Sequence, residues 1–407
     1  MKQSGEKNKP KVCVVSFPMP SVIVVNVFLY NLVEILELIC EKIYVVTSNI
    51  PRDRTFGEKI KIQDVKTTMH FRNTIHPMWW STLLQFLKII IIQLKMCWIL
   101  IKISKDTDIV IFYVGGANLF PPVLMAKLLG KKVITSAIGL GSLGYRKAYD
   151  KGLFSMSGAF STILNILERA NFSISDLILV ESHSVIDFLG LEKYKHKIVA
   201  SGARYIDTDF FQIKKELRER KNLVGYIGRL EEGKGVMNFV KAIPLILEKQ
   251  DNFKFLLGGY GPLYDRIKER LRSNNLSRKV ELIGWIPHDK VANYLNELKL
   301  LVLPSYSEGL PTVVLESMAC GTPVLATPVG GIPDVIKDGE TGFILEDNSP
   351  ECIAEDVIRA LNSPNLDEIV INACNIIEEK YTYEGAVERY REILNKILEV
   401  NRNNARV

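Results

Sequence analysis

Two series of short, β-rich apolar runs alternate with longer helical patterns along this chain, and they limit the folds that it can adopt. Continuous apolar runs of strand length suit parallel strands that helices cover on both faces. The sequence therefore predicts an α/β protein with two doubly wound, Rossmann-like parallel sheets, each with ligand sites at the carboxyl ends of its strands. The expected strands are residues 12–17, 43–47, 109–114, 133–137, 177–181 and 198–201 in the first sheet, and 224–227, 254–257, 280–283, 300–304, 324–327 and 342–345 in the second.

The length of 407 residues agrees with two large domains, because a domain typically has about 150 residues. We place an N-terminal domain at 1–205, a linker at 206–221, a second domain at 222–380 and a C-terminal helix at 381–407. The boundary is marked by a stretch rich in Lys, Arg and Glu. The last segment has the pattern of an amphipathic helix. Its apolar side is expected to contain Val387, Tyr390, Ile393, Leu394 and Ile397.

The composition is that of a folded globular protein, with 47% hydrophobic and 24% charged residues. It excludes a disordered, collagen-like or disulfide-based chain. A net charge of +6 suits an anionic small ligand or an anionic membrane surface, and is too small to indicate nucleic acid by itself. Six scattered cysteines without a C-x-x-C pair indicate reduced thiols. The first apolar run is too short for a signal peptide, so we expect a cytoplasmic protein.

The most apolar segment of the chain is Trp79–Ile103, which contains four consecutive isoleucines. Lys88, Lys95 and Lys102 interrupt it at intervals of seven, so at about 100° per residue they form one narrow stripe on a helix. Each lysine would cost roughly 2.5–3.5 kcal/mol near the centre of a bilayer, and we therefore reject a transmembrane span. Two interpretations stay open: a buried domain helix with a thin solvent-facing side, and a helix lying in plane on an anionic leaflet.

A glycine-rich turn at 228–235 follows the expected strand 224–227 and contains Arg229 and Lys234. Backbone N–H groups at a junction of strand, turn and helix attract an anion, and so does the positive end of the helix. A guanidinium can bind a phosphate through two hydrogen bonds, and an ammonium adds a point charge. The alternative is an ordinary loop with surface charges.

A second segment places a carboxylate where an apolar residue is expected. Glu316 lies in a short helix, predicted between Pro311 and Gly321, whose other residues are apolar or small. Ionised carboxylates are not buried without partners. The paired hydroxyls of a ribose would satisfy Glu316, as they do for the acidic residue in dinucleotide folds. Glu308 lies in the preceding loop, where it would reach a second polyol or a leaving phosphate.

These motifs resemble the GT-B glycosyltransferases of family 4, the glycosyl transferases group 1. Glu308 and Glu316 match that family's E-x7-E motif, and residues 228–235 match its diphosphate-binding turn. Residues 258–262, 284–287 and 327–333 are similar to its intervening landmarks. The resemblance is specific across 222–350 and loose before residue 200.

The resemblance implies a GT-B fold, with two Rossmann-like domains facing across a cleft and the N-terminal one binding the acceptor. It implies that the last helix crosses back to the N-terminal domain, although an ordinary packing helix is the alternative. The implied reaction is retaining transfer of a sugar from a nucleotide-sugar donor to a glycan or lipid-linked acceptor. Because of the apolar segment Trp79–Ile103, the favoured version has this acceptor at the inner membrane face.

By the same resemblance, Arg229 and Lys234 would hold the donor diphosphate, Glu316 the ribose and Glu308 the donor sugar. Arg229, Lys234 and Glu308 are the expected catalytic residues, because they would stabilise the departing diphosphate and orient the sugar. The other expected donor contacts are Gly261, Trp285, Ile286, Gly309, Leu310 and Thr312.

No cofactor or metal is expected beyond the nucleotide-sugar substrate. The D-x-D pattern of metal-dependent glycosyltransferases occurs twice, at 106–108 and 207–209, which shows how weak it is. Residues 139–144 match G-x-G-x-x-G but do not follow a first strand, so we interpret them as a loop lining the cleft. Residues 145–147 beside them would meet an anionic acceptor.

The N-terminal half departs from the family at two positions. Residues 18–21 stand in place of a Gly-Gly loop, and Ile138-Gly139 in place of a His-Gly pair. Two alternatives stay open beside transfer, the first because it shares the fold and the second because of these departures. One is a GT-B sugar-nucleotide epimerase, and the other is a non-catalytic sugar-nucleotide-binding protein.

Overall fold

The computed structural model describes residues 9–17, 22–47, 56–65, 79–137, 156–200 and 203–404. The chain divides into two compact units. Unit 1 comprises residues 1–181, 191–203 and 386–407, and unit 2 comprises 182–190 and 204–385. All six cysteines are free thiols, in agreement with the absence of a disulfide pattern in the sequence.

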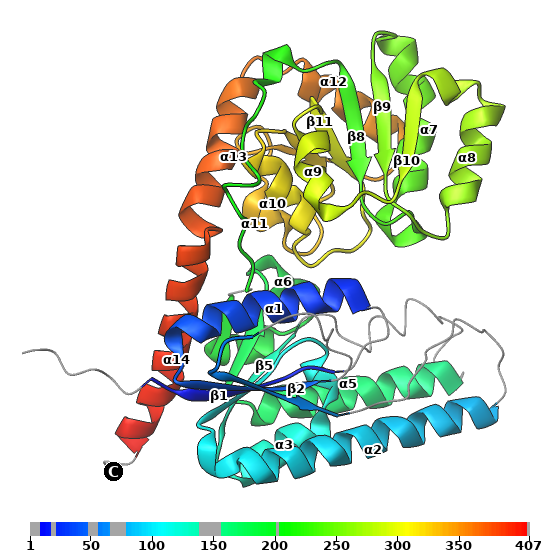
Figure 1. Cartoon of the computed structure of the whole chain (residues 1–407). Helices are drawn as coiled ribbons and strands as arrows, with labels where there is room; N and C mark the ends of the chain where they lie inside the picture. The colour runs from blue at the N-terminus through cyan, green and yellow to red at the C-terminus, as the bar shows by residue number, and fades with distance from the viewer. Residues whose placement is uncertain are drawn as a thin grey trace, which may run out of the picture. The chain divides into compact units, whose positions relative to one another are not determined.

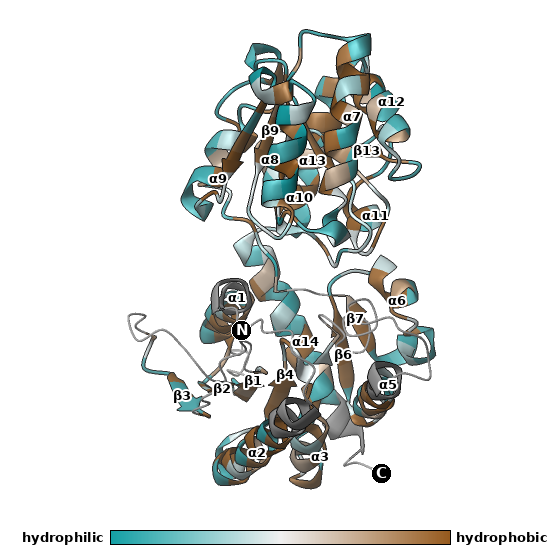
Figure 2. Cartoon of the chain, turned by 90° about the vertical axis from the view of Figure 1, so that its right-hand side faces the viewer, coloured by the Kyte–Doolittle hydropathy of each residue, from teal (hydrophilic) through white to brown (hydrophobic). Residues whose placement is uncertain are grey.

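Unit 1 is built on a parallel sheet whose described strands have the order β3-β2-β1-β4-β5-β6-β7. Helix α1 covers one face of this sheet, and α2, α3 and α5 cover the other (Figures 1 and 2). The strands are β1 (Lys11–Val15), β2 (Lys42–Thr47), β3 (Ile60–Asp64), β4 (Ile109–Phe112), β5 (Lys132–Ser136), β6 (Leu177–Val180) and β7 (Ile198–Ala200). The helices are α1 (Val22–Ile39), α2 (Trp79–Ile103), α3 (Phe120–Leu128) and α5 (Met156–Ile174).

Unit 2 has a second parallel sheet, with described strands in the order β10-β9-β8-β11-β12-β13. The strands are β8 (Leu223–Ile227), β9 (Lys254–Gly258), β10 (Val280–Gly284), β11 (Leu300–Leu303), β12 (Val324–Ala326) and β13 (Phe343–Ile344). The helices are α6 (Ser184–Phe188), α7 (Val236–Lys249), α8 (Tyr264–Ser273), α9 (His288–Leu295), α10 (Thr312–Ala319), α11 (Ile332–Val335), α12 (Pro350–Leu361) and α13 (Leu366–Lys380). The predicted fold class, two doubly wound α/β units, is thus confirmed.

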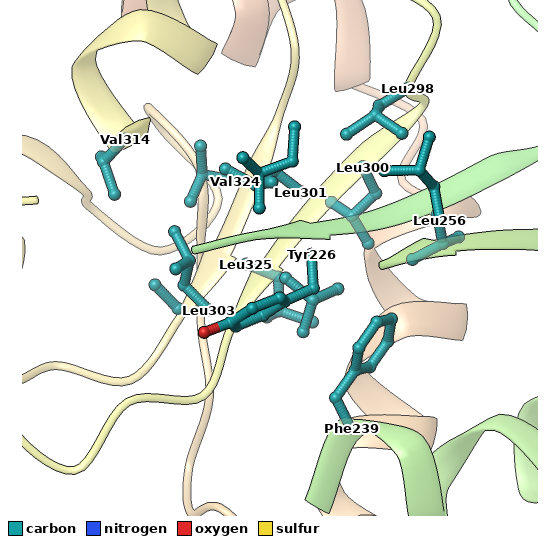
Figure 3. Close-up of a cluster of buried hydrophobic side chains, with 14 of the residues drawn as sticks. Tyr226, Phe239, Leu256, Leu298, Leu300, Leu301, Leu303, Val314, Val324 and Leu325 are labelled. Carbon is teal, nitrogen blue, oxygen red and sulfur yellow. The ribbon is translucent and has the colours of Figure 1, made fainter. Parts of the chain in front are cut away.

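The core of unit 2 lies between its sheet and the helices on the two faces. Figure 3 shows Tyr226 of β8, Phe239 of α7 and Val314 of α10 among the strand leucines that they cover. Only the hydroxyl of Tyr226 is polar in this labelled cluster, and it donates a hydrogen bond of 2.7 Å to the Arg229 carbonyl oxygen. Burial raises the pKa of that hydroxyl. The continuous apolar strand sequences therefore reflect burial on both faces.

Every expected strand is present, with ends shifted by one or two residues. Among the strands that the structure describes, the sequence missed β3, at one edge of the first sheet. Its apolar residues Ile60 and Ile62 alternate with the polar Lys61 and Gln63, and Ile62 is exposed. An edge strand without burial on both faces has no continuous apolar run, so the pattern used for the other strands did not include it.

Two segments fold with unit 2 rather than where the sequence placed them. In the expected linker, Arg220 is only 3% exposed and donates hydrogen bonds to the carbonyl oxygens of Leu298 (3.0 Å) and Cys320 (2.7 Å). Segment 182–190 belongs to unit 2 because Asp334 accepts hydrogen bonds from the backbone N–H groups of His183 (2.6 Å) and Ser184. Charge density alone did not reveal that Arg220 satisfies buried carbonyl groups.

The C-terminal helix, α14, extends over Tyr383–Asn404. From residue 386 onwards it belongs to unit 1, and all five of its expected apolar residues are buried. Tyr383, at its start, packs against Tyr205 with the ring centroids 5.0 Å apart. One helix therefore continues from the last residues of unit 2 into the core of unit 1.

Candidate functional site

The expected donor residues follow neighbouring strands of the second sheet. Strand β8 lies between β9 and β11, so the order of the strands reverses at this point. In open α/β sheets, ligands bind at the carboxyl ends of the strands where such a reversal occurs. The turn after β8 contains Arg229 and Lys234, and the loop after β11 contains Glu308. Residues far apart in the sequence thus reach the same edge of one sheet.

Lys234 and Glu308 form an ion pair at this edge. The distance from Lys234 Nζ to Glu308 Oε2 is 2.7 Å, and the two side chains are 18% and 8% exposed. Ser305 donates a hydrogen bond of 2.7 Å to the other carboxylate oxygen of Glu308. Because both carboxylate oxygens have partners, the ammonium and carboxylate are held in one geometry. A cation held in this way presents a preorganised charge to an anion.

The turn after β8 is held by backbone contacts that require glycine. Gly235, at the start of α7, has a φ of +63°, and a Cβ there would collide with the Pro304 carbonyl oxygen. A Cβ at Gly261 would collide with the Leu230 carbonyl oxygen. Leu230 also donates its N–H to the Tyr260 carbonyl oxygen at 3.1 Å. Gly261 therefore packs the turn after β9 directly against the turn after β8, which contains Arg229 and Lys234.

The loop with Glu308 is held in the same manner. The Gly309 carbonyl oxygen accepts a hydrogen bond of 2.5 Å from the N–H of Gly331. Leu310 is buried in the core of unit 2, so its side chain anchors the loop. Thr312, at the first position of α10, accepts a hydrogen bond of 2.7 Å from Arg204 Nη1.

Glu316 is buried on α10, as its apolar surroundings in the sequence indicated. Its Oε1 lies 2.8 Å from Nε2 of His288, whose ring packs against Phe211 with the centroids 5.5 Å apart. The hydrogen bond with Glu316 raises the pKa of His288 above its ordinary value. The carboxylate is thus partnered by an imidazole at the surface, not by another group of the core.

The remaining expected residues lie on the surrounding turns. Arg229 is mostly exposed, and its Nη2 lies 3.0 Å from Glu231 Oε1. Trp285 follows β10 and is 65% exposed, whereas its neighbour Ile286 is buried. The structure therefore brings Lys234 and Glu308 into contact, whereas Arg229 and Glu316 contact other groups and Trp285 is exposed.

Sequence reasoning missed three polar partners: His288, Ser305 and Arg204. His288 directly follows the 284–287 landmark, and this position was the available signal. Ser305 lies two residues after the end of β11, and its sequence position did not indicate that its hydroxyl donates a hydrogen bond to Glu308. Arg204 precedes the expected domain boundary, so its contact with Thr312 depends on the tertiary fold.

The other sequence motifs have different surroundings. Asp106 pairs with Lys11 (3.1 Å) and Lys42, and the hydrogen bond from Lys42 lowers its pKa. Asp207 accepts hydrogen bonds from the backbone N–H groups of Asp209 and Phe210, both at 3.1 Å. No three His, Cys, Asp or Glu side chains of the described residues gather in a metal-binding arrangement. Segments 18–21 and 138–147 lie outside the described residues.

Comparison with known proteins identifies relatives of this chain. Residues 207–375 match the model of the family described as glycosyl transferases group 1. An uncharacterized glycosyltransferase of Methanocaldococcus jannaschii is 33% identical over 42% of this chain and 47% of the relative. N-acetyl-alpha-D-glucosaminyl L-malate synthase of Bacillus anthracis is 30% identical over 59% of this chain and 65% of the relative. These alignments thus span about half to two thirds of each relative.

The fold has a solved counterpart over nearly the whole chain. The structure of Anabaena HepE in complex with UDP has a TM-score of 0.71 and 14% identity, and it covers 95% of this chain and 100% of its own. At that identity the likeness concerns the fold alone, and it includes both parallel-sheet units. The chain therefore has the GT-B fold, and its residues 207–375 are similar to the glycosyl transferases group 1.

Proposed function

We propose that this protein is a retaining glycosyltransferase of family 4 that transfers a sugar from a nucleoside-diphosphate sugar to a glycan or lipid-linked acceptor. The observation that supports this proposal best is the Lys234–Glu308 pair at the strand reversal of unit 2. A preorganised cation suits a diphosphate, and a carboxylate suits the hydroxyls of a sugar. The structural neighbour HepE was solved in complex with UDP, which agrees with a nucleoside-diphosphate donor.

Each part of the donor has an assigned contact in this proposal. Lys234 and the exposed guanidinium of Arg229 bind the diphosphate. Glu308 and the backbone of Gly309 and Leu310, together with the Thr312 hydroxyl, contact the sugar. The buried carboxylate of Glu316 accepts hydrogen bonds from the ribose hydroxyls. The base lies beside Gly261, Trp285 and Ile286 and is read mainly by backbone groups.

The proposed transfer takes place on one face of the sugar. The acceptor hydroxyl oxygen forms a bond to the anomeric carbon while the bond from that carbon to the diphosphate oxygen breaks. The diphosphate leaves with the electron pair and takes the proton of the acceptor hydroxyl. Negative charge grows on the leaving group, so Lys234 and Arg229 lower the barrier by electrostatic stabilisation. No metal or cofactor takes part in this scheme.

The proposal places the protein in the cytoplasm, at the inner face of the membrane, with peripheral contact through Trp79–Ile103. Lipid-linked acceptors lie at a membrane surface, and this apolar helix with three lysines suits an anionic one. None of the described helices is both long and apolar enough to cross a membrane. The contact is therefore peripheral.

The experiment offers the purified protein a panel of UDP-, GDP- and ADP-sugars. Release of nucleoside diphosphate is followed with and without membrane extract, and the sugar is analysed for inversion at a ring carbon. We expect release that depends on the extract, with retained anomeric configuration in the product. Formation of an epimer without an acceptor would show that the protein is an epimerase and not a transferase. Tight nucleotide binding without turnover of any donor would indicate a non-catalytic binding protein.

A further inference from the structure

The helix α2 has two different apolar faces. One face, which includes Ile92, Met96 and Leu100, is buried in the core of unit 1. The opposite face is also apolar, yet it is exposed; the side chain of Leu94, for example, is 59% exposed. We call this face the apolar ridge. Its described members are Leu87, Ile90, Ile91, Leu94, Trp98 and Ile101.

The three lysines of α2 flank the ridge. At about 100° per residue, Lys88, Lys95 and Lys102 lie along one edge of the exposed arc, between the apolar ridge and the buried face. All three lysines are exposed, in agreement with this placement on the helix. The Nζ of Lys102 lies 3.8 Å from the ring centroid of Trp98. An apolar strip with cations along its border is the arrangement of helices that lie in a membrane interface.

The neighbouring helices extend the apolar surface. Helix α3 packs against α2, and α5 packs against α3, on the same face of the sheet (Figures 1 and 2). Their outward side chains include Leu124 and Leu128 of α3, and Ile163 and Ile166 of α5, all exposed. Apolar groups on three adjacent helices form a patch, and they differ in this from the single exposed apolar residues of ordinary surfaces.

The charge of this layer has one sign. The sequences of α2, α3 and α5 contain five basic residues and one acidic residue, Glu168, which is buried. Among the basic residues, Lys127 is paired with Asp176 at 2.8 Å. The lysines of α2 thus provide the outward positive charge. A partner protein with an acidic apolar face would need a matching shape, whereas an anionic bilayer supplies both features without one.

We infer that the outer surface of α2, α3 and α5 docks on an anionic phospholipid bilayer. The apolar ridge enters the boundary between headgroups and acyl chains, and Lys88, Lys95 and Lys102 contact lipid phosphates. The inference deepens the proposed function, which has an acceptor at a membrane, and it names the whole three-helix face and the lipid charge. The docking itself requires neither a donor nor turnover.

Vesicle flotation tests the docking surface. Full-length protein is mixed with vesicles of phosphatidylcholine alone or of phosphatidylcholine with phosphatidylglycerol. We expect flotation with the anionic vesicles, suppressed by salt because surface charges are screened. Replacing Lys88, Lys95 and Lys102 by Gln removes about fivefold of affinity for each lysine, or about a hundredfold in all. The matched control replaces Lys241, Lys254 and Lys268 of unit 2 by Gln, and we expect flotation to persist.

The apolar contribution is tested separately. Leu94→Gln weakens flotation with anionic vesicles, while Ile371→Gln, on α13 of unit 2 and also 59% exposed, leaves it unchanged. Circular dichroism and nucleotide affinity, measured on every variant, show whether unit 2 is intact. Equal flotation of the two lysine variants, or a stable dimer that Leu94→Gln dissociates, would overturn the docking surface. If nucleotide binding fails while flotation succeeds, only the proposed function is affected.

Discussion

The proposed binding of ribose by the buried carboxylate of Glu316 can be tested with a single substitution. Glu316 lies on α10 with His288 as its described hydrogen-bond partner, so its second oxygen is the proposed acceptor for ribose hydroxyls. A hydrogen bond to a charged group contributes about 1.5–3 kcal/mol. We therefore expect Glu316→Ala to weaken the binding of the preferred nucleoside diphosphate at least about tenfold. Isothermal titration calorimetry measures this change.

The controls for Glu316 separate binding from folding. Glu316→Gln keeps the volume of the side chain and should also lose affinity, since it removes the charge. Glu368→Gln, at an exposed position of α13, should bind as the original protein does. An unchanged affinity in Glu316→Ala with an unchanged unfolding curve would remove the ribose assignment.

The His288–Glu316 pair makes stability depend on pH. Contact with Glu316 raises the pKa of His288 above its ordinary 6.5, so the folded protein holds this proton more tightly than the unfolded chain. The resulting stability is fully present below pH 6.5 and is lost as the pH rises through the raised pKa. The ring is 72% exposed, so solvent screens the pair and the contribution stays below about 1 kcal/mol.

The variant His288→Gln isolates this contribution, because glutamine keeps a hydrogen bond without a titratable charge. We expect the original protein to have the higher free energy of unfolding in mildly acidic solution and to lose that advantage at alkaline pH. Urea denaturation at a series of pH values measures it. A difference between the two proteins that grows with pH would contradict the sign.

At the scale of elements, the turn between β8 and α7 depends on one glycine. Gly235→Ala would place a side chain at a positive φ and against the Pro304 carbonyl oxygen. The backbone conformation alone costs about 1–2 kcal/mol. We expect a loss of at least that size in the free energy of unfolding of unit 2, and a lower affinity for nucleotide, since Lys234 precedes the glycine.

A neighbouring glycine in the same turn is the matched control. A Cβ at Gly233 would meet no atom within 4 Å, and its φ is outside the left-handed range. Gly233→Ala should therefore preserve both stability and affinity. Equal losses in the two variants would show that the turn tolerates no added methyl group, whatever its backbone conformation.

The elements also show where sequence reasoning succeeds. Buried parallel strands such as β8 and β11 have continuous apolar sequences, and the glycines and carboxylates beside them occur at recognisable spacings. The edge strand β3 has neither signal. The Lys234–Glu308 contact joins residues 74 positions apart, and no local pattern encodes that distance. Contacts that the tertiary fold creates, such as His288 with Glu316, therefore became visible only in the structure.

At the scale of the whole molecule, α14 supplies core residues to unit 1 from the far end of the chain. Tyr390, Leu394 and Ile397 are buried there, together with Val387 and Ile393. Each such side chain contributes about 1.5–3 kcal/mol, and a domain is stable by only about 5–15 kcal/mol. We expect removal of residues 386–407 to unfold unit 1 while unit 2 stays folded.

Limited proteolysis with mass spectrometry measures this outcome. In the truncated protein, peptides from residues 1–181 should be digested while a fragment within 204–385 persists. A chain that ends after Glu399 keeps the buried residues and should resist digestion throughout. Equal resistance of both units without α14 would show that unit 1 does not need it.

The hydrogen bonds between Asp334 and segment 182–190 limit where the gene can be divided into domains. By holding segment 182–190 in unit 2, Asp334 makes the polypeptide pass between the units four times, after residues 181, 190, 203 and 385. No single cut or recombination point therefore yields one complete unit from a contiguous stretch of codons. A domain exchange with a relative has to transfer segment 182–190 together with residues 204–385. A fragment that lacks this segment leaves the Asp334 carboxylate without the N–H groups of His183 and Ser184.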